Sequence, residues 1–360
     1  MRLKSFLLAL PLLILFPIAA HGEVTTVVIS AAGDCTLGRD ERNGYAGSFD
    51  WYYEQNGAAY FFGNVAEIFK NDDLTIVNLE GALTLSNEGE DKKYVFKGPP
   101  DYAEILRLGN IEAVTLANNH TYDYGRRGYA DTKDALDEYG IKYFGNGDSL
   151  LYEVKGIFIG LLGYSGFGGA SMNVMEAEIA GLRENGAALV IVSFHWGVEY
   201  DNYPSETQKR LARFAVDAGA DLVLGHHPHV MQGIELYKGK FIVYSLANFS
   251  FGGNRNPSDK DTFIFKQTFT LTDGKPTQDI NIDIIPCRVS SVASRNDFKP
   301  TPLFCAEGER VLNRLIEFSG PFYDLSGRRH FRSYLKAALR EGYTFDDAKD
   351  VPPGKEIFPF

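Results

Sequence analysis

The sequence contains little cysteine and no excess of positive charge. Three cysteines occur among its 360 residues, and none of their spacings is that of a zinc ribbon. The formal net charge of −11 opposes binding to nucleic acid or anionic lipid, so we expect no nucleic-acid partner. We find no internal repeat and no low-complexity segment. The glycine-rich GYSGFGG at 163–169 lacks the Lys-Ser/Thr of a P-loop, which makes it an ordinary loop.

An apolar run long enough to cross a membrane is also missing. The N-terminal run from Phe6 to Ala20 is shorter than the roughly 20 residues that a spanning helix needs. Basic residues precede it and small residues follow it, at Ala20-His21-Gly22. We therefore expect residues 1–22 to be a secretory signal peptide, with an uncleaved N-terminal anchor as the alternative. Either reading places the remaining chain outside the cytoplasm, as a secreted, periplasmic or cell-envelope protein.

The composition is that of an ordinary globular protein. Hydrophobic residues make up 44% of the chain and charged residues 23%, which is enough to bury a full core. The length suits one large α/β domain or two ordinary ones. In an oxidising compartment Cys287 and Cys305 are candidates for a disulfide, which would leave Cys35 unpaired.

Apolar, β-branched runs that end in polar residues recur along the chain. Such runs are typical of strands buried on both faces, and they lie at 25–34, 73–81, 111–120, 156–165, 188–197, 221–229 and 240–249. Helical stretches at 129–140 and 205–220 separate some of them. This alternation predicts an α/β fold with at least partly parallel sheets, whose ligands gather beyond the carboxyl ends of the strands.

The pattern changes after about residue 250. An alternating segment predicts an antiparallel hairpin that turns at Asp273-Gly274. Helices are expected at 308–318 and 328–341. We therefore divide the chain into a domain at 25–290 and a helical extension at 291–360 that packs on it.

Histidines are concentrated at the predicted strand ends. Five of the six that follow the expected leader lie there, namely His120, His195, His226, His227 and His229. The same strand ends carry Asp34, Glu80, Asn119 and Asp123. Imidazole combined with carboxylate and amide oxygen suits zinc, manganese or iron. A carboxylate that bridges two ions would make a two-metal hydrolytic centre.

Several motifs occur in the order found in the CapA family of poly-γ-glutamate capsule synthesis proteins. They are GDCTLGRD, NLEGAL, LANNHTYDYG, SFHWGVEY, GHHPHVMQG and YSLANFSF, and together they span roughly residues 25–252. The CapA family in turn resembles the calcineurin-like metallophosphoesterases. This resemblance implies a four-layer α/β/β/α sandwich.

The resemblance also implies a role for each motif residue. The metal ligands would be Asp34, Glu80 in place of the bridging aspartate, Asn119, His195, His227 and His229. Alternate residues after a strand point the same way, so His227 and His229 reach one centre while His226 points elsewhere. The resemblance makes His120 the acid that protonates a leaving group. Asp123 either orients His120 or caps the next helix.

One position departs from the phosphoesterase pattern. Thr36 stands where an imidazole ligand is usual, which leaves open whether the centre holds one divalent ion or two. Candidate substrate-binding residues surround the motifs: Lys97, Arg126, Trp196, Glu199 and Asn248. For Lys97 and Arg126 the alternative is a solvated charged face, for Trp196 it is packing, and for Glu199 it is support of a ligand.

Two functions follow from the resemblance. The first is a metal-dependent hydrolase or transferase that acts on an amide of a γ-linked glutamate polymer or on a phosphoester. The second is a non-catalytic component of capsule assembly and export, which binds the anionic polymer or membrane synthase partners. An unrelated extracellular binding protein with a histidine-rich loop fits poorly, because the clusters recur at successive strand ends.

Overall fold

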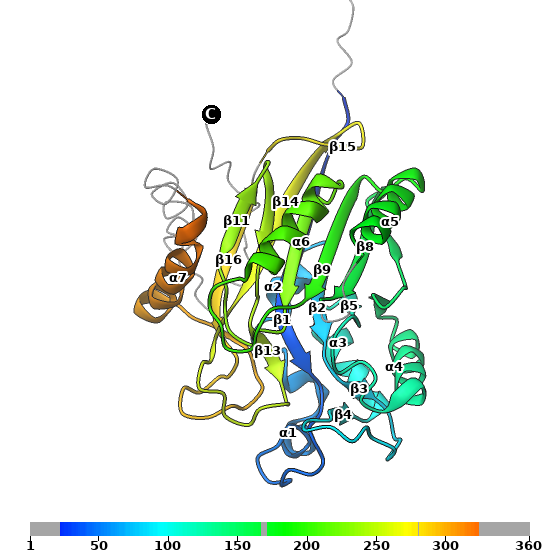
Figure 1. Cartoon of the computed structure of the whole chain (residues 1–360). Helices are drawn as coiled ribbons and strands as arrows, with labels where there is room; N and C mark the ends of the chain where they lie inside the picture. Colours follow the sequence, from blue (N-terminus) through cyan, green and yellow to red (C-terminus); the bar gives the residue numbers. More distant parts are fainter. Residues whose placement is uncertain (1–21, 167–170, 280, 324–360) are drawn as a thin grey trace, which may run out of the picture.

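The computed structural model describes residues 22–166, 171–279 and 281–323. Residues 1–21 of the expected leader and the helix expected at 328–341 lie outside these ranges. Within them, no helix is both long and apolar enough to cross a membrane. Figure 1 shows the strands side by side with helices on the outside.

The first sheet is parallel on one side and antiparallel on the other. Its order is β17-β16-β14-β1-β2-β5-β6, with β13 parallel to β1 and β15 antiparallel to β14. The strands are β1 (Val24–Thr36), β2 (Leu74–Leu79), β5 (Ala113–Thr115), β6 (Lys142–Phe144), β13 (Asn248–Phe251), β14 (Asp261–Thr272), β15 (Lys275–Pro276), β16 (Asn281–Arg288) and β17 (Thr301–Pro302). As expected, the chain turns at Asp273-Gly274, where Thr272 pairs with Lys275.

The second sheet has a parallel centre and antiparallel edges. Its order is β11-β12-β10-β9-β8-β7. These strands are β7 (Leu150–Val154), β8 (Ile157–Ser165), β9 (Leu189–His195), β10 (Leu222–His226), β11 (Ile234–Tyr237) and β12 (Lys240–Val243). A short parallel pair, β3 (Ala82–Leu83) with β4 (Lys97–Gly98), lies apart from both sheets.

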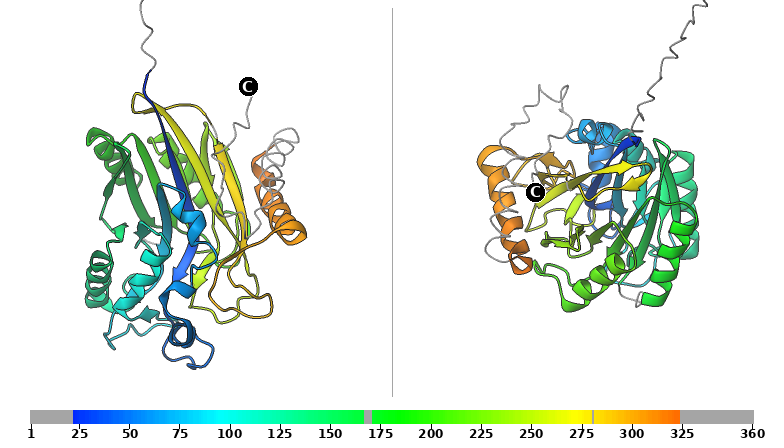
Figure 2. Two further views of the ribbon diagram at one scale, coloured as in Figure 1. Left: turned by 180° about the vertical axis from the view of Figure 1, so that it is seen from behind. Right: turned by 90° about the horizontal axis from the view of Figure 1, so that it is seen from above.

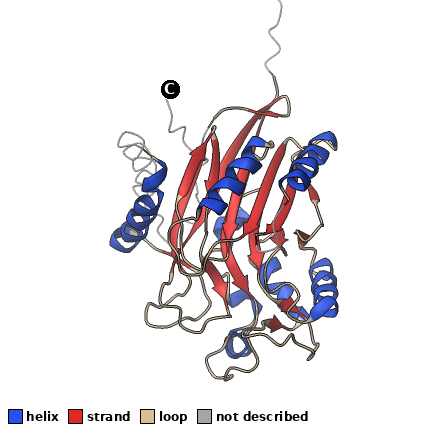
Figure 3. Ribbon diagram, viewed as in Figure 1, coloured by secondary structure: helices blue, strands red, loops and turns tan. Residues whose placement is uncertain are grey.

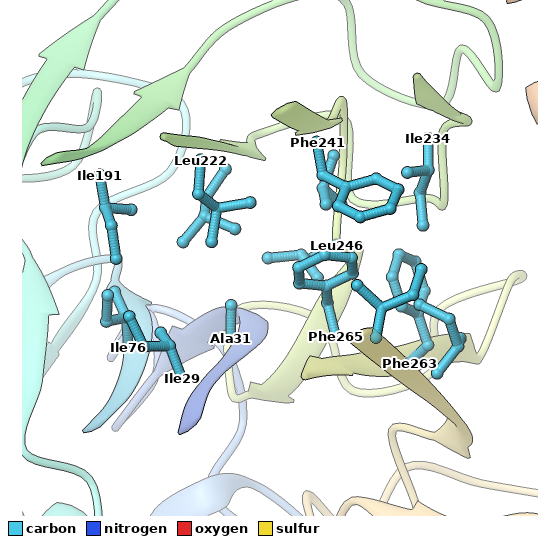
Figure 4. Close-up of a cluster of buried hydrophobic side chains, with 14 of the residues drawn as sticks. Ile29, Ala31, Ile76, Ile191, Leu222, Ile234, Phe241, Leu246, Phe263 and Phe265 are labelled. Carbon is cyan, nitrogen blue, oxygen red and sulfur yellow. The ribbon is translucent and has the colours of Figure 1, made fainter. Parts of the chain in front are cut away.

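Side chains on the facing surfaces of the two sheets form one apolar core. Ile29 and Ile76 of the first sheet belong to the same buried cluster as Ile191, Leu222 and Phe241 of the second (Figure 4). Because neighbouring residues of a strand point to opposite faces, the residues between them face outward toward helices. Each such buried aliphatic side chain contributes roughly 1.5–3 kcal/mol to folding.

Helices cover the outer faces of both sheets. On the first sheet lie α1 (Phe49–Asn56), η1 (Ala58–Tyr60), α2 (Ala66–Lys70), η2 (Pro100–Tyr102), α3 (Ala103–Leu108) and α4 (Gly125–Glu138). The second sheet carries α5 (Met172–Glu184) and α6 (Glu206–Asp217). The view from above in Figure 2 shows these helices on opposite sides of the strands, and Figure 3 separates the two element types by colour. The expected α/β/β/α sandwich is thus confirmed.

A further helix, α7 (Cys305–Ser319), lies beside β16 and β11 and is followed by η3 (Gly320–Phe322). It includes the helix expected at 308–318. The helix expected at 205–220 begins where predicted, because Ser205 and Gln208 form a reciprocal capping box at the start of α6.

Two expectations are wrong. The apolar run at 240–249 is not one strand: β12 ends at Val243 in the second sheet, and β13 begins at Asn248 in the first. The chain crosses between the sheets at Ala247, whose φ of 63° ends the extended backbone. The disulfide is also absent, because Cys287 is buried under the helices of the first sheet whereas Cys305 is exposed at the start of α7.

Candidate metal centre

Strand ends from both sheets converge on one buried cluster of polar side chains. Asp34 lies near the end of β1, Glu80 directly follows β2, and His195 ends β9. Each of these side chains is at most 1% exposed. One ligand atom from each lies within 4.8 Å of one from each of the others. The structure therefore brings together residues that are up to 161 positions apart.

Glycines allow the two sheets to close over this cluster. Asp34 N donates to Ala247 O at 2.8 Å, and Leu246 N donates to Gly225 O at 3.1 Å. A Cβ on Gly33 would lie 2.0 Å from Ala247 O, and one on Gly225 would lie 2.0 Å from the carbonyl oxygen of Tyr244. No side chain fits at such distances, which explains the glycine before Asp34 and the glycine that opens GHHPH.

Three imidazole rings surround the carboxylate oxygen Oε1 of Glu80. The Nε2 atoms of His120, His195 and His229 lie 3.8, 3.9 and 3.8 Å from it. This buried oxygen has no hydrogen-bond partner among the described residues. Ligands that each lie about 2.0–2.2 Å from a shared cation are themselves roughly 3–4 Å apart. The spacing and the donor types therefore fit a divalent cation.

Two asparagines that the sequence analysis missed hold the ligands in place. Asn78 Nδ2 lies 2.9 Å from Asp34 Oδ1 and 3.3 Å from His195 Nδ1. Asn118 Nδ2 donates to Asn78 Oδ1 at 3.0 Å and to the carbonyl oxygen of Leu79 at 2.8 Å. For Asn78, an amide inside the apolar strand β2 was the available signal, whereas Asn118 lies in the loop after β5. The predicted ligand Asn119 is exposed, and its Oδ1 lies 2.7 Å from His195 Nε2.

His120 is oriented by a carboxylate that is itself fixed. Its Nδ1 lies 2.8 Å from Asp123 Oδ2, which also accepts from the backbone N–H of Phe96 at 2.6 Å. Lys92 Nζ forms an ion pair with the other oxygen of Asp123 and donates to Asn119 O at 2.9 Å. The N-cap residue of α4 is Tyr124, without a side-chain capping bond, so the Asp123 side chain turns toward His120 instead.

The GHHPH segment is not extended where its histidines meet the site. β10 ends at His226, and both His227 and His229 have positive φ, 96° and 58°. Their ring centroids are 5.6 Å apart, so the two rings do meet, although strand alternation is not the reason. The expectation that His226 points elsewhere is wrong, because its Nδ1 lies 3.2 Å from Asp34 Oδ1.

Burial and charge shift the pKa values of the cluster in opposite directions. Burial raises the pKa of Glu80 well above its usual range, and the negative charges of Asp34 and Asp123 add to this. Burial also opposes ionisation of Asp34, but hydrogen bonds from His226 and His229 outweigh it and keep the pKa of Asp34 well below its usual value.

The imidazoles respond to the same two influences. Burial lowers the pKa of His195 well below its usual value and that of His227 to about 4. Burial would also lower the pKa of His229, but the carboxylates of Glu80 and Asp34 outweigh it and raise the value to about 9. Carboxylates buried this deeply need a positive charge beside them, which a metal ion can supply.

A cavity of about 390 Å³ opens beside the cluster. His120, His229, Glu199 and Asn248 line it, together with Arg39, Asp40, Lys93, Tyr94, Tyr200 and Arg255 among others. Asn248 Oδ1 also lies 2.9 Å from His229 Nδ1. Another hollow, of about 400 Å³ on the outer face of α6, contains none of the predicted site residues.

The structure does not bring the other predicted substrate-binding residues to this cavity. Lys97 is buried and held by Glu41 at 2.9 Å and by the carbonyl oxygen of Ser86 at 2.6 Å. Arg126 is exposed in the first turn of α4. Trp196 is buried under α5 and α6, and its Nε1 donates to Tyr244 O at 2.9 Å. In this structure Lys97 anchors a loop, Arg126 is exposed to solvent, and Trp196 packs in the core.

Fold and site define the class of this protein: a layered α/β sandwich with a histidine–carboxylate cluster at the strand ends. Comparison with known families then identifies it further. Residues 28–253 match the family model described as bacterial capsule synthesis protein PGA_cap. The chain belongs to this family, in agreement with the resemblance to CapA proteins.

Individual relatives carry related names. Capsule biosynthesis protein CapA of Bacillus anthracis is 32% identical over 259 residues, which are 64% of this chain and 61% of the relative. PGA biosynthesis protein CapA of Bacillus subtilis (strain 168) is 34% identical over 221 residues, 55% of this chain and 58% of the relative. The match thus spans less than two thirds of either relative's length.

A solved structure also aligns with this chain. It is that of a hypothetical protein from Thermus thermophilus, with a TM-score of 0.44 and 15% identity. The alignment covers 72% of this chain and 99% of that chain. A likeness this low supports no inference about function.

Proposed function

We propose that this protein is an extracytoplasmic, metal-dependent hydrolase or transferase of poly-γ-glutamate capsule synthesis. The observation that carries the proposal is the buried Glu80 Oε1 with the Nε2 atoms of His195 and His229 at 3.9 and 3.8 Å. A buried carboxylate oxygen without a hydrogen bond is costly unless a cation binds it. Family membership and the printed names of the relatives supply the link to capsule polymer.

The residues that would hold the cation are Asp34, Glu80, Asn119, His195, His227 and His229. Imidazole with carboxylate favours zinc, manganese or iron over magnesium or calcium. Such an ion lowers the pKa of a bound water and polarises a carbonyl or phosphoryl oxygen. Asn78 and Asn118 keep the ligands in place through the hydrogen bonds described above.

His120 is placed to transfer a proton. Asp123 holds the proton at Nδ1, which leaves Nε2 facing Glu80 and the cavity. We expect the doubly protonated His120 ring to donate its Nε2 proton to the leaving group. His120→Ala should abolish turnover while metal content, measured by elemental analysis, stays nearly unchanged. A variant that keeps its activity would remove His120 from this role.

The cavity supports an anionic substrate. Arg39, Lys93 and Arg255 line it, although the chain as a whole is negatively charged. A glutamate polymer carries one carboxylate per residue and an amide between residues, so these cations would hold it with an amide beside His120. A phosphoester would use the same cations.

Incubation with poly-γ-glutamate tests the proposal. The full-length protein should shorten the polymer or release it from an acceptor, and a chelator should stop the reaction. Chain length is followed by gel electrophoresis, with His120→Ala as the matched inactive control. A phosphodiester substrate, tested in parallel, distinguishes amide from phosphoester cleavage. An unchanged polymer and an uncleaved ester at saturating metal would contradict the enzymatic proposal.

The second candidate is a non-catalytic component of capsule assembly that binds the polymer or a membrane synthase. Thr36 favours it, because this buried hydroxyl stands where the phosphoesterase pattern has an imidazole. A protein that only binds need not keep every ligand. This candidate predicts that poly-γ-glutamate binds to the protein, as measured by calorimetry, and that the polymer keeps its length.

Placement outside the cytoplasm is part of the proposal and rests on residues 1–22. A basic start, a short apolar run and small residues at Ala20-His21-Gly22 are the features of a secretory leader. The intact mass of the protein from its native host tests this. Loss of the first 22 residues is expected for a signal peptide, whereas the full mass would indicate the anchored alternative.

A further inference from the structure

Five charged side chains, besides the histidines, line the cavity beside the cluster. They are Arg39, Asp40, Lys93, Glu199 and Arg255. These charges are not equally available to a ligand, because a charge that is already paired within the protein attracts a second partner only weakly. Their contacts within the protein therefore decide which of them can bind a substrate.

Two of the five are paired with residues nearby in the sequence. Arg39 Nε lies 2.6 Å from Asp50 Oδ2, and Arg39 Nη1 donates to Asn43 O at 3.0 Å. The side chain of Asp40 is 4% exposed, and Arg42 binds both of its oxygens, at 2.9 Å through Nε and at 2.6 Å through Nη2. Arg39 and Asp40 therefore shape the wall of the cavity and add little net charge to it.

Glu199 belongs to the histidine side of the cavity. Its carboxylate offers a ligand atom within 4.8 Å of one from His227 and one from His229. Its negative charge therefore lies beside imidazoles and cannot itself attract an anionic substrate.

Lys93 and Arg255 are the two cations that remain. Both are exposed, and neither forms an ion pair with a carboxylate in the ranges that the structure describes. Lys93 Nζ lies 4.8 Å from the ring centroid of Tyr94, and Arg255 Nη2 donates to the carbonyl oxygen of Ala46. A ring face and a carbonyl oxygen do not neutralise a cation, so both side chains keep their full charge for a ligand.

One loop holds the backbones of both cations at the border of the cavity. Arg42 in this loop donates through Nη2 to Lys93 O at 2.7 Å. The guanidinium of Arg255 lies against the two glycines of the same loop. A Cβ on Gly44 would lie 3.6 Å from its Nη1, and one on Gly47 would lie 3.4 Å from its Nη2. The two cations are thus placed by the fold and are not independent surface charges.

We propose that Lys93 and Arg255 determine substrate specificity by binding two carboxylates of one chain. Once the first carboxylate is bound, the second binds within the same complex, which favours a chain of repeated carboxylates over a small molecule with one anionic group. This inference rests on the proposed function and narrows it. Arg39 becomes part of the wall, and a γ-linked glutamate chain is selected over a phosphomonoester.

Calorimetry with a short chain tests the proposal. γ-Linked tetraglutamate is titrated into full-length His120→Ala, which prevents turnover during the measurement. Adding Lys93→Met or Arg255→Met should raise the dissociation constant about tenfold, the usual effect of losing a charged hydrogen bond. Lys93→Arg should keep the affinity because it keeps the charge. Arg107→Met, which removes an exposed arginine of α3, is the matched control and should change nothing.

The charge of the ligand provides a second readout. A tetramer whose α-carboxylates are amidated should bind at least tenfold more weakly, and neither Met variant should weaken its binding further. Inorganic phosphate, a single anion, should not displace the tetramer at equal concentration. Added salt should weaken binding of the tetramer more in His120→Ala alone than in either Met variant.

Outcomes separate this inference from the proposed function. Unchanged affinity for the tetramer in either Met variant would overturn it, as would tight binding of phosphate or no binding of the tetramer. Loss of affinity in both Met variants, without any turnover by the unchanged protein, would support the two-cation site and contradict the enzymatic proposal. Normal turnover of polymer by both Met variants with His120 intact would do the reverse. Unaltered circular dichroism confirms that the variants are folded.

Discussion

Among single residues, Lys92 links Asp123, the partner of His120, to Asn119, the partner of His195. Its ammonium group pairs with the buried carboxylate of Asp123 and donates to the carbonyl oxygen of Asn119. Asp123 Oδ2 lies 2.8 Å from Nδ1 of His120, and Asn119 Oδ1 lies 2.7 Å from Nε2 of His195. Lys92 is therefore a positioning residue, which acts through the side chains that would handle the proton and the cation.

Lys92→Met should reduce turnover by about tenfold or more, the usual size of an effect transmitted through a supporting side chain. The methionine cannot pair with Asp123, so His120 loses its fixed orientation, while bound metal should change little. Lys92→Arg should restore most of the activity because a guanidinium keeps the ion pair. Lys70→Met, on an exposed ion pair of α2, is the control. Equal losses in kcat for Met and Arg at position 92 would contradict the positioning role.

For individual residues, prediction from the sequence was correct at some positions and wrong at others. Asp34, Glu80 and His195 were predicted to lie together, because polar residues at the ends of apolar strands meet at one edge of a sheet, and they do. The expectation for His226 is wrong, because strand alternation ends with β10 at His226 and the residues His227 and His229 have positive φ. A left-handed backbone at a histidine leaves no mark in the sequence as it does at glycine.

At the level of elements, close contacts between strand ends hold the site together. The backbone of β10 approaches the segment between β12 and β13 so closely that only glycine fits at position 225. The sequence contained this information only in part. The run at 240–249 looks like one strand, because an apolar pattern does not show which of two sheets each half joins.

Gly225→Ala should lower the free energy of unfolding by about 1–3 kcal/mol or more, the cost of overpacking a rigid site. The added Cβ would lie 2.0 Å from a backbone carbonyl oxygen, which cannot move as a side-chain end could. Gly181→Ala is the matched control. It lies within α5, where a Cβ meets no atom within 4 Å. This control should stabilise the protein by about 0.5–1 kcal/mol in urea denaturation. Similar effects of the two substitutions would contradict the packing argument.

Helix α7 is attached to the first sheet through charge. Arg310 Nη1 lies 2.6 Å from Asp261 Oδ2 in β14, and Arg314 binds both Asp259 and Asp261. Burial opposes ionisation of Asp261, but hydrogen bonds from Arg310 and Arg314 outweigh it and lower its pKa. A carboxyl with a lowered folded-state pKa stabilises the protein above its unfolded pKa, and this contribution is lost as the pH falls through the folded value.

Asp261→Asn should therefore cost about 1–2 kcal/mol at pH 7, at the lower end for charged hydrogen bonds because both arginines are partly exposed. The difference from the unchanged protein should shrink as the pH falls below about 4, because Asp261 becomes protonated there in the unfolded chain and at lower pH in the folded protein. Urea denaturation at several pH values measures this. A difference that stays constant down to pH 3 would show that the charge of Asp261 is not the cause.

The whole molecule places a histidine–carboxylate cluster and a cavity lined by charged residues at one end of two packed sheets. The fold class was predictable, because long apolar runs alternating with helices allow few arrangements. That Asp34, Glu80 and His195 lie together was predictable from polar residues at strand ends, whereas the roles of Asn78 and Asn118 needed coordinates. Such groups contribute through distance and direction, which residue type alone does not encode.

A crystal structure of the protein with anomalous data collected at the zinc or manganese absorption edge tests the central claim most directly. We predict an anomalous peak about 2.0–2.2 Å from Glu80 Oε1, with Asp34 and His195 among its ligands. The account would be contradicted if crystals soaked in either metal at neutral pH showed no anomalous peak beside Glu80.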